Sequence, residues 1–99
     1  MRENPDNAPE VQEHYKVKLE AMTDAQLFHE TNDKIWLSAH ANNNPHSCFH
    51  WQADATYKEA QRRGKPKIYS DAYRVTYKGC GYGDPHPEDG PIMNWEAKL

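Results

Sequence analysis

Hydrophobic positions recur at helical spacing in four segments of the chain. The clearest segment spans 24–41 and follows Thr23, which begins the capping-box sequence Thr-Asp-Ala-Gln. In such a box the Thr23 side chain accepts a hydrogen bond from the Gln26 backbone, and the Gln26 side chain bonds back. Three asparagines at 42–44 stop the pattern. We therefore predict a helix whose inward face carries Leu27, Phe28, Thr31, Ile35, Ser38 and Ala39.

A second helix is predicted over 45–63. Asn44 is a good N-cap, Pro45 is favoured at the first helical position, and Gly64 ends the segment. The apolar stripe of this helix consists of Phe49, Ala53, Thr56 and Ala60, widened by Trp51 and Ala55. Because only a few residues separate the two helices, we expect an antiparallel hairpin over 24–63.

Two shorter helices are predicted beside the hairpin, over 9–22 and 66–78. Their apolar faces carry Val11, Tyr15, Leu19 and Met22 in the first, and Ile68, Ala72 and Val75 in the second. Residues 74–78 also alternate like a strand, but a lone strand would have no partner in the chain, so a helix is favoured. The sequence therefore predicts an all-α fold with one helical domain over 9–78.

The two ends of the chain differ in composition from this domain. Residues 79–91 contain four glycines and three prolines, a composition that does not supply a packed core. We expect a disordered Gly/Pro-rich tail over 79–99, in which Trp95 is a candidate short docking element, and a flexible N-terminal end over 1–8.

Composition narrows the function classes. Leu, Ile, Val and Phe make up only about 12% of the chain, below the roughly 20% that separates packed from disordered chains, although a net charge of −3 is too small for disorder. We expect a thin, aromatic core that favours docking on a partner or a second copy as a homodimer.

The longest apolar run is three residues, which predicts a cytoplasmic protein without a membrane segment. No nucleotide-binding or nucleophile motif is present, so we predict a non-enzyme without a cofactor.

Tryptophan and arginine side chains are the candidate partner-binding residues. Trp36 lies about 100° around its predicted helix from the buried stripe, and Trp51 holds a similar place near the start of the opposing helix. Because Trp and Arg dominate interface hot spots, we expect both indoles to anchor a partner protein. Cations near the end of the second helix would set the register electrostatically: Arg62, Arg63 and Lys65. The alternative is that both tryptophans pack across the hairpin.

A basic block over 58–78 offers a second hypothesis. It carries seven cations against two acids, and tyrosines are interleaved with it. Lys and Arg beside aromatic rings bind single-stranded nucleic acid by phosphate contact and stacking. The candidate residues are Lys58, Arg62, Arg63, Lys67, Tyr69, Tyr73, Arg74, Tyr77 and Lys78. The alternative is that the cations complement helix C-termini and the tyrosines are half-buried core.

A zinc site is a third hypothesis. His46 and His50 lie four residues apart on one face of the predicted helix, and Cys80 with His86 would complete four ligands. No paired C-x2-C ligands are present, so polar histidines and free thiols remain the simpler interpretation.

Several stretches give the chain a family resemblance. Ala-Asn-Asn-Asn-Pro at 41–45, Phe-His-Trp-Gln at 49–52 and Gln-Arg-Arg-Gly-Lys at 61–65 resemble small early-region proteins of tailed bacteriophages, over about residues 17–78. The resemblance implies a protein that binds one host protein or complex in the host cytoplasm and blocks or redirects it. This binding role is the leading hypothesis.

Overall fold

The computed structural model describes residues 8–41, 47–93 and 95. In these ranges the chain forms four α-helices and the short 3-10 helix η2, without a strand. Their bounds are α1 (Pro9–Glu20), α2 (Asp24–His40), α3 (Cys48–Arg62), α4 (Lys67–Gly79) and η2 (Pro87–Asp89). The predicted all-α fold is confirmed, including a helix where residues 74–78 alternate like a strand. No helix in the described ranges has the length and apolarity needed to cross a bilayer.

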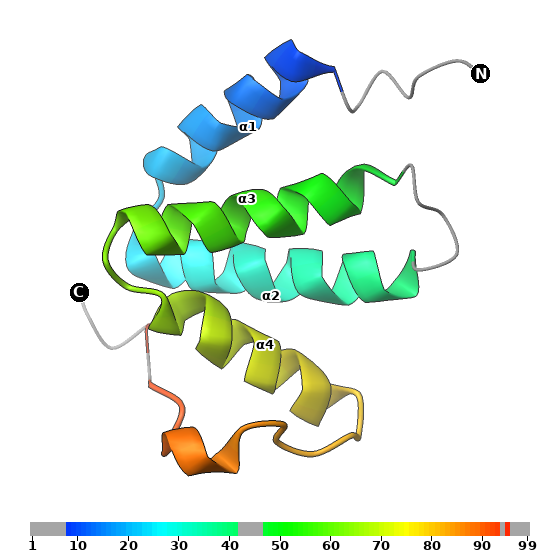
Figure 1. Ribbon diagram of the computed structural model, residues 1–99, viewed down its shortest axis with the longest axis vertical. Helices are drawn as coiled ribbons and strands as arrows, with labels where there is room; N and C mark the ends of the chain where they lie inside the picture. Colours follow the sequence, from blue (N-terminus) through cyan, green and yellow to red (C-terminus); the bar gives the residue numbers. More distant parts are fainter. Residues whose placement is uncertain (1–7, 42–46, 94, 96–99) are drawn as a thin grey trace.

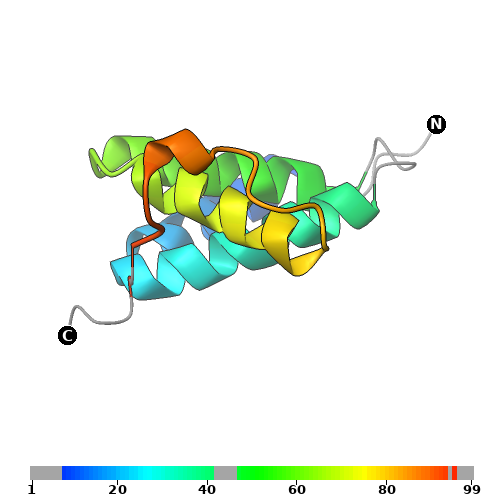
Figure 2. The ribbon, with the colours of Figure 1, turned by 90° about the horizontal axis from the view of Figure 1, so that it is seen from below.

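Helix α2 lies at the centre of the arrangement. It packs against α3 on one side and α4 on the other, and α1 packs on α3. Figure 1 shows α2 and α3 side by side, running in opposite directions, while α1 diverges from α3 toward its own N-terminal end. Figure 2 shows α4 in front of α2, and the segment after α4 running back across α4. The face of α3 near its N-terminal end is therefore only partly covered by α1.

The start of α2 follows the predicted capping box. The Gln26 backbone N–H donates to Thr23 Oγ1 over 3.1 Å, and the Thr23 N–H donates to Gln26 Oε1 over 2.9 Å. Burial along the helix then matches the predicted stripe at Leu27, Thr31 and Ile35. The stripe ends there, because Ala39 in the last turn is exposed. The predicted inward position of Ala39 is thus wrong.

The start of α3 differs from the sequence prediction. The helix begins at Cys48, and Ser47 is its N-cap, with Ser47 Oγ accepting a hydrogen bond from the Phe49 N–H over 3.3 Å. Ser47 is as good an N-cap as Asn44, lies three residues after it, and satisfies the amide of Phe49 in the first turn of the helix. The predicted start at Pro45 is therefore displaced, and residues 42–46 lie outside the described residues.

The core is small and partly polar. Its buried cluster consists of Tyr15, Leu19, Leu27, Ala60, Ile68 and Trp95. Thr31 and Thr56 are fully buried and satisfy their hydroxyls by donating to backbone carbonyls of their own helices, each over 2.6 Å. Val11, which was predicted to face inward, is 39% exposed because it lies in the part of α1 that diverges from α3.

The segment after α4 is tied back to that helix. Arg74 donates two hydrogen bonds to the Asp84 carboxylate, at 2.9 and 2.6 Å, and a third to the Gly90 carbonyl at 2.6 Å. The Trp95 indole N–H donates to the buried Asp71 carboxylate over 3.1 Å, and Trp95 is only 4% exposed. The described part of the predicted tail thus follows a defined course, with η2 as its regular element. The predicted flexible N-terminal end is outside the described residues except for Ala8, and so are residue 94 and 96–99.

Candidate functional site

The two candidate tryptophans occupy different environments. Trp36 is 44% exposed on α2, and its ring stacks on His40 with 3.7 Å between centroids and 27° between planes. Trp51 on α3 is half-buried and meets the Tyr15 ring of α1 edge-on at 5.4 Å. Trp51 therefore packs on α1, and Trp36 presents the more open aromatic face.

Arg63 lies at the junction of three helices. Its guanidinium donates to Glu59 of α3, to Asp24 of α2 and to the carbonyls of Leu19 and Met22 at the end of α1, over 2.6 to 3.0 Å. Only 12% of its side chain is exposed. Arg63 thus satisfies the C-terminal carbonyls of α1 and holds this helix to α2 and α3. These bonds leave little of the guanidinium for a partner.

Lys65 and Arg62 surround the same junction. Lys65 Nζ bonds to Asp24 Oδ2 over 2.5 Å, and this bond, with help from Arg63, lowers the pKa of Asp24. Arg62 donates two hydrogen bonds to Glu59, and this contact, again with Arg63, lowers the pKa of Glu59. Arg62 differs from Arg63 in being 55% exposed. Lys65 is 46% exposed, so of the three predicted cations both Arg62 and Lys65 keep a substantial exposed surface alongside their ion pairs, and Arg63 does not.

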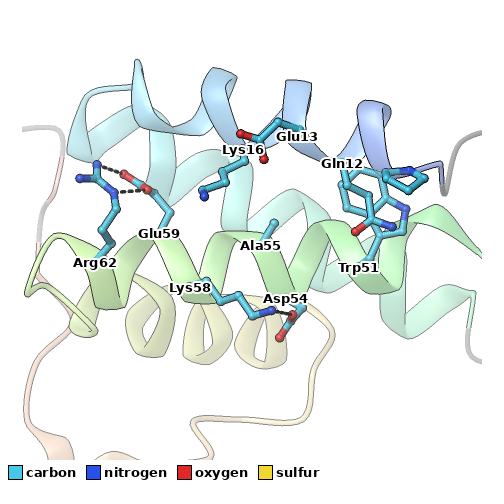
Figure 3. A pocket seen from close by; sticks show the side chains of 10 residues that line it. Gln12, Glu13, Lys16, Trp51, Asp54, Ala55, Lys58, Glu59 and Arg62 are labelled. Atoms are coloured by element: carbon cyan, nitrogen blue, oxygen red, sulfur yellow. Dashed lines mark hydrogen bonds and ion pairs between the residues drawn. The ribbon is translucent and has the colours of Figure 1, made fainter.

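A pocket opens between α1 and α3. Its volume is about 400 Å³, and its walls are formed by Pro9, Gln12, Glu13, Lys16, Trp51, Asp54, Ala55, Lys58, Glu59 and Arg62. Figure 3 shows Trp51 and Arg62 at opposite ends of this pocket, with Ala55 between them on α3. The structure thus brings two of the five predicted partner-binding residues to one site.

The pocket combines an apolar floor with charges of both signs. Lys58 pairs with Asp54 at 3.0 Å and Arg62 pairs with Glu59 at 2.7 Å, so four of the charges are compensated along α3. Figure 3 shows the Lys16 side chain reaching from α1 into the space between the helices. A second pocket, of about 600 Å³, lies against α1 and also uses Trp51, together with Val11 and Tyr15. We call the two pockets together the α1–α3 groove.

The α1 side of the groove was not predicted from the sequence. Lys16 and Gln12 lie on the polar face of a weakly amphipathic helix, where periodicity indicates only solvent. Val11 is the apolar residue of this helix that could have pointed to the groove. In the structure it stays 39% exposed and lines the second pocket.

Ion pairs within the chain neutralise most of the basic block. Residues 58–78 are all described, and six of their seven cations pair with a carboxylate of the chain: Lys58, Arg62, Arg63, Lys65, Lys67 and Arg74. Arg74 is only 2% exposed and is held by Asp84. The remaining cation, Lys78, is exposed at the end of α4. Phosphate contact by the paired cations would require breaking these internal pairs.

The tyrosines of this region form a continuous strip. Neighbouring ring centroids lie 5.1, 6.5, 4.6 and 6.0 Å apart along the series Tyr57, Tyr69, Tyr73, Tyr77 and Tyr82. Tyr73 donates a hydrogen bond to the Tyr77 hydroxyl over 2.9 Å, and this bond raises the pKa of Tyr73 to about 12. Burial and the nearby Asp54 raise the pKa of Tyr69. We call these five residues the tyrosine strip.

The candidate zinc ligands are placed as follows. His50 Nδ1 lies 2.7 Å from Ser38 Oγ, Cys80 is exposed just after α4, and the His86 ring lies 6.3 Å from the Tyr73 ring. Within the described ranges no three His, Cys, Asp or Glu side chains gather as a metal ion would need. His46 lies outside the described residues.

Comparison of the chain with protein-family models, with curated proteins and with solved structures finds no match. The fold and its two surfaces define a small all-helical domain with a charged groove and a separate aromatic strip.

Proposed function

We propose that this chain is a small non-enzymatic binding protein that docks a partner protein in the α1–α3 groove. The observation that carries the proposal is Trp51, a half-buried aromatic ring shared by two adjacent pockets and bordered by charged side chains. Aromatic side chains at the centre of a desolvated patch with a polar rim supply most of the free energy of protein association.

An amphipathic helix of the partner is the occupant that suits this groove. α1 and α3 diverge, so α1 covers the N-terminal half of α3 only in part. An apolar side chain of an incoming helix would contact Trp51 and Ala55. Charged residues one turn away on that helix would pair with Lys16 and with the rim of Asp54 and Lys58.

A protein is favoured over a nucleic acid as the partner. Affinity for a nucleic acid depends on Lys and Arg side chains that neutralise its phosphates and thereby release the counterions condensed on it. Six cations of the basic block are instead paired with the chain's own carboxylates. The chain also carries a net charge of −3, which repels a polyanion at long range.

The resemblance to early-region phage proteins extends the proposal to a biological role. The partner is then a host protein or complex, and occupation of its surface blocks or redirects it by steric means. Support for this role comes from the stretches within about residues 17–78 that carry the resemblance.

The test is affinity capture from a lysate of the natural host, followed by measurement of Kd with the purified partner. Trp51→Ala removes the central anchor, and we expect it to weaken binding at least about thirtyfold, the effect of a 2 kcal/mol hot spot. Because Trp51 also packs on Tyr15, Lys16→Glu serves as a second variant, which changes the groove at an exposed position.

The matched control is Lys78→Glu, the same charge reversal at an exposed site outside the groove. We expect Lys78→Glu to leave Kd within about twofold, well below the hot-spot effect. Equal binding by the Lys16 and Lys78 variants, each shown to be folded by circular dichroism, would contradict the assignment of the groove.

A further inference from the structure

The segment after α4 docks on that helix as an arm. We define the arm as residues 84–93 and 95, and its seat as Asp71, Arg74 and the apolar side chains that share the buried cluster with Trp95. We infer that the arm exchanges between two copies of the chain, so that the α4 of each copy binds the arm of the other. The inference rests on α4 and the arm alone, and it holds independently of the proposed function.

The seat is specific for the arm and must remain filled. Asp71 is fully buried and accepts hydrogen bonds from the Met93 N–H over 3.2 Å and from the Trp95 indole N–H over 3.1 Å. Trp95 is 4% exposed and belongs to the same buried cluster as Leu19 and Leu27. Loss of this ring would leave a cavity in a small core and a buried carboxylate without two of its donors, and both are costly. An arm that leaves its seat is therefore replaced by a ligand with the same amide and indole spacing, which a second copy supplies.

The arm is held by a few point contacts. Arg74 bonds to Asp84 at one end and to the Gly90 carbonyl further along, while residues 86–89 between them are exposed. Figure 2 shows this part of the arm running back across α4. A second copy reproduces every one of these contacts, because its arm and its seat are the same. Exchange of an identical element is therefore a low-cost route to a dimer.

Gly83 is the hinge of the arm. Gly81 and Tyr82 donate backbone hydrogen bonds to the last turn of α4, and Asp84 is the first anchor of the arm, so Gly83 stands between the two sets of bonds. Its φ is +78°, and a Cβ at this position would meet no atom of the described residues within 4 Å. Rotation at Gly83 thus redirects the arm without breaking side-chain packing at the hinge itself.

The buried charges of α4 have an alternative partner while the arm is away. Among the described residues Arg74 Nη1 has no hydrogen-bond acceptor, and it lies 3.8 Å from Asp71 Oδ1. Lys67 already donates to the same oxygen over 2.9 Å. Arg74 and Asp71 lie one turn apart on α4, so they can pair directly once the arm detaches. This pairing lowers the cost of the open state through which two arms exchange.

The test strains the hinge. Gly83→Val places a β-branched residue at a positive φ, which destabilises the closed chain and is relieved when the hinge opens. In analytical ultracentrifugation we expect the unmodified full chain to form a concentration-dependent dimer, and Gly83→Val to tighten dimerisation at least about tenfold. The matched control is Gly90→Val, the same change at a φ of +82° inside the arm. Its strain is equal in the closed and exchanged forms, so it should not tighten dimerisation.

Two further variants and a crosslink tie the dimer to the arm. Trp95→Ala removes the core anchor, and Asp84→Asn weakens the anchor next to the hinge without changing the core; either one, added to Gly83→Val, should restore the monomer. A photoreactive residue in place of the exposed Met93, in a chain mixed with a heavy-isotope-labelled chain, should give crosslinked pairs of mixed mass. The inference is overturned by a monomeric Gly83→Val chain, by equal tightening in Gly90→Val, by a dimer that survives both anchor changes, or by crosslinks confined to single chains.

Discussion

At the scale of single residues, Arg62 and Arg63 show how adjacent identical side chains take opposite roles. Both bond to Glu59, yet Arg63 also reaches α2 and the end of α1, whereas Arg62 is 55% exposed and lines the groove. A step of one residue turns a helical side chain by about 100°, which directs one arginine into the helix junction and the other toward the groove.

Replacement of Arg63 should therefore destabilise the fold. Arg63→Ala leaves carbonyls of Leu19 and Met22 without their donor and removes a partner of Glu59, which is 4% exposed. We expect a loss of about 3 kcal/mol in the free energy of unfolding, measured by urea denaturation.

Arg62→Ala is the matched control for this change. It removes a half-exposed ion pair to the same carboxylate, so the loss in unfolding free energy should be much smaller than that of Arg63→Ala. Similar losses for the two variants would show that Arg63 does not join the helices as described.

The different roles of these arginines could not be predicted from the sequence. The sequence predicts a partner-binding role for both because arginine is common at interface hot spots and a cation sets register electrostatically, and neither argument distinguishes two adjacent arginines. Only the tertiary arrangement places the end of α1 beside Arg63. In contrast, the sequence predicts Trp51 and Arg62 as partner-binding residues, and the structure brings both to one pocket.

At the scale of elements, the helix ends that the sequence predicts correctly are those set by interactions between residues close together in the chain. The capping box at Thr23 and the glycine after Arg63 locate the start of α2 and the end of α3, because both act through bonds within a few residues. The start of α3 was wrong because Asn44 and Ser47 are competing caps of similar strength. The course of the segment after α4 was not predictable, because it depends on Arg74 and Asp71 bonding to residues 10 to 24 positions away.

The tether of that segment should depend on pH. The hydrogen bonds from Arg74 lower the pKa of Asp84 from its ordinary 3.8 to about 2. A depressed folded-state pKa stabilises the tethered form above the ordinary value, and this contribution is lost as pH falls from about 4 toward 2. Amide resonances of Gly81, Gly83 and Gly90 in NMR spectra should shift toward unstructured positions over that window.

Asp84→Asn tests the same tether without acid. It should give these displaced resonances at pH 6, because a neutral amide cannot hold the guanidinium as a carboxylate does. Glu88→Gln, a neutralisation of an exposed acid in the same segment, should leave them in place. Unchanged glycine resonances in Asp84→Asn would show that Arg74 does not hold the segment through this carboxylate.

At the scale of the whole molecule, most charges of the basic block hold the fold, and aromatic side chains outside the core form two surfaces, one of which we propose for recognition. A small core surrounded by ion pairs fixes the four helices, while Trp51 in the α1–α3 groove and the tyrosine strip offer two separate surfaces. Composition predicted a thin, aromatic core, and the buried cluster is small and includes Tyr15 and Trp95. Composition could not predict that α1 would diverge from α3, since that geometry follows from where Arg63, Tyr15 and Leu19 anchor α1.

The central claim is that a partner protein occupies the α1–α3 groove, and site-specific photocrosslinking tests it most directly. A photoreactive residue at position 16 lies in the groove, and one at position 39 lies on an exposed turn of α2 outside it. In host lysate we expect one protein to crosslink from position 16, to be absent from position 39, and to disappear when Trp51→Ala is added. The same proteins crosslinked from both positions, or no protein crosslinked from position 16, would contradict the account.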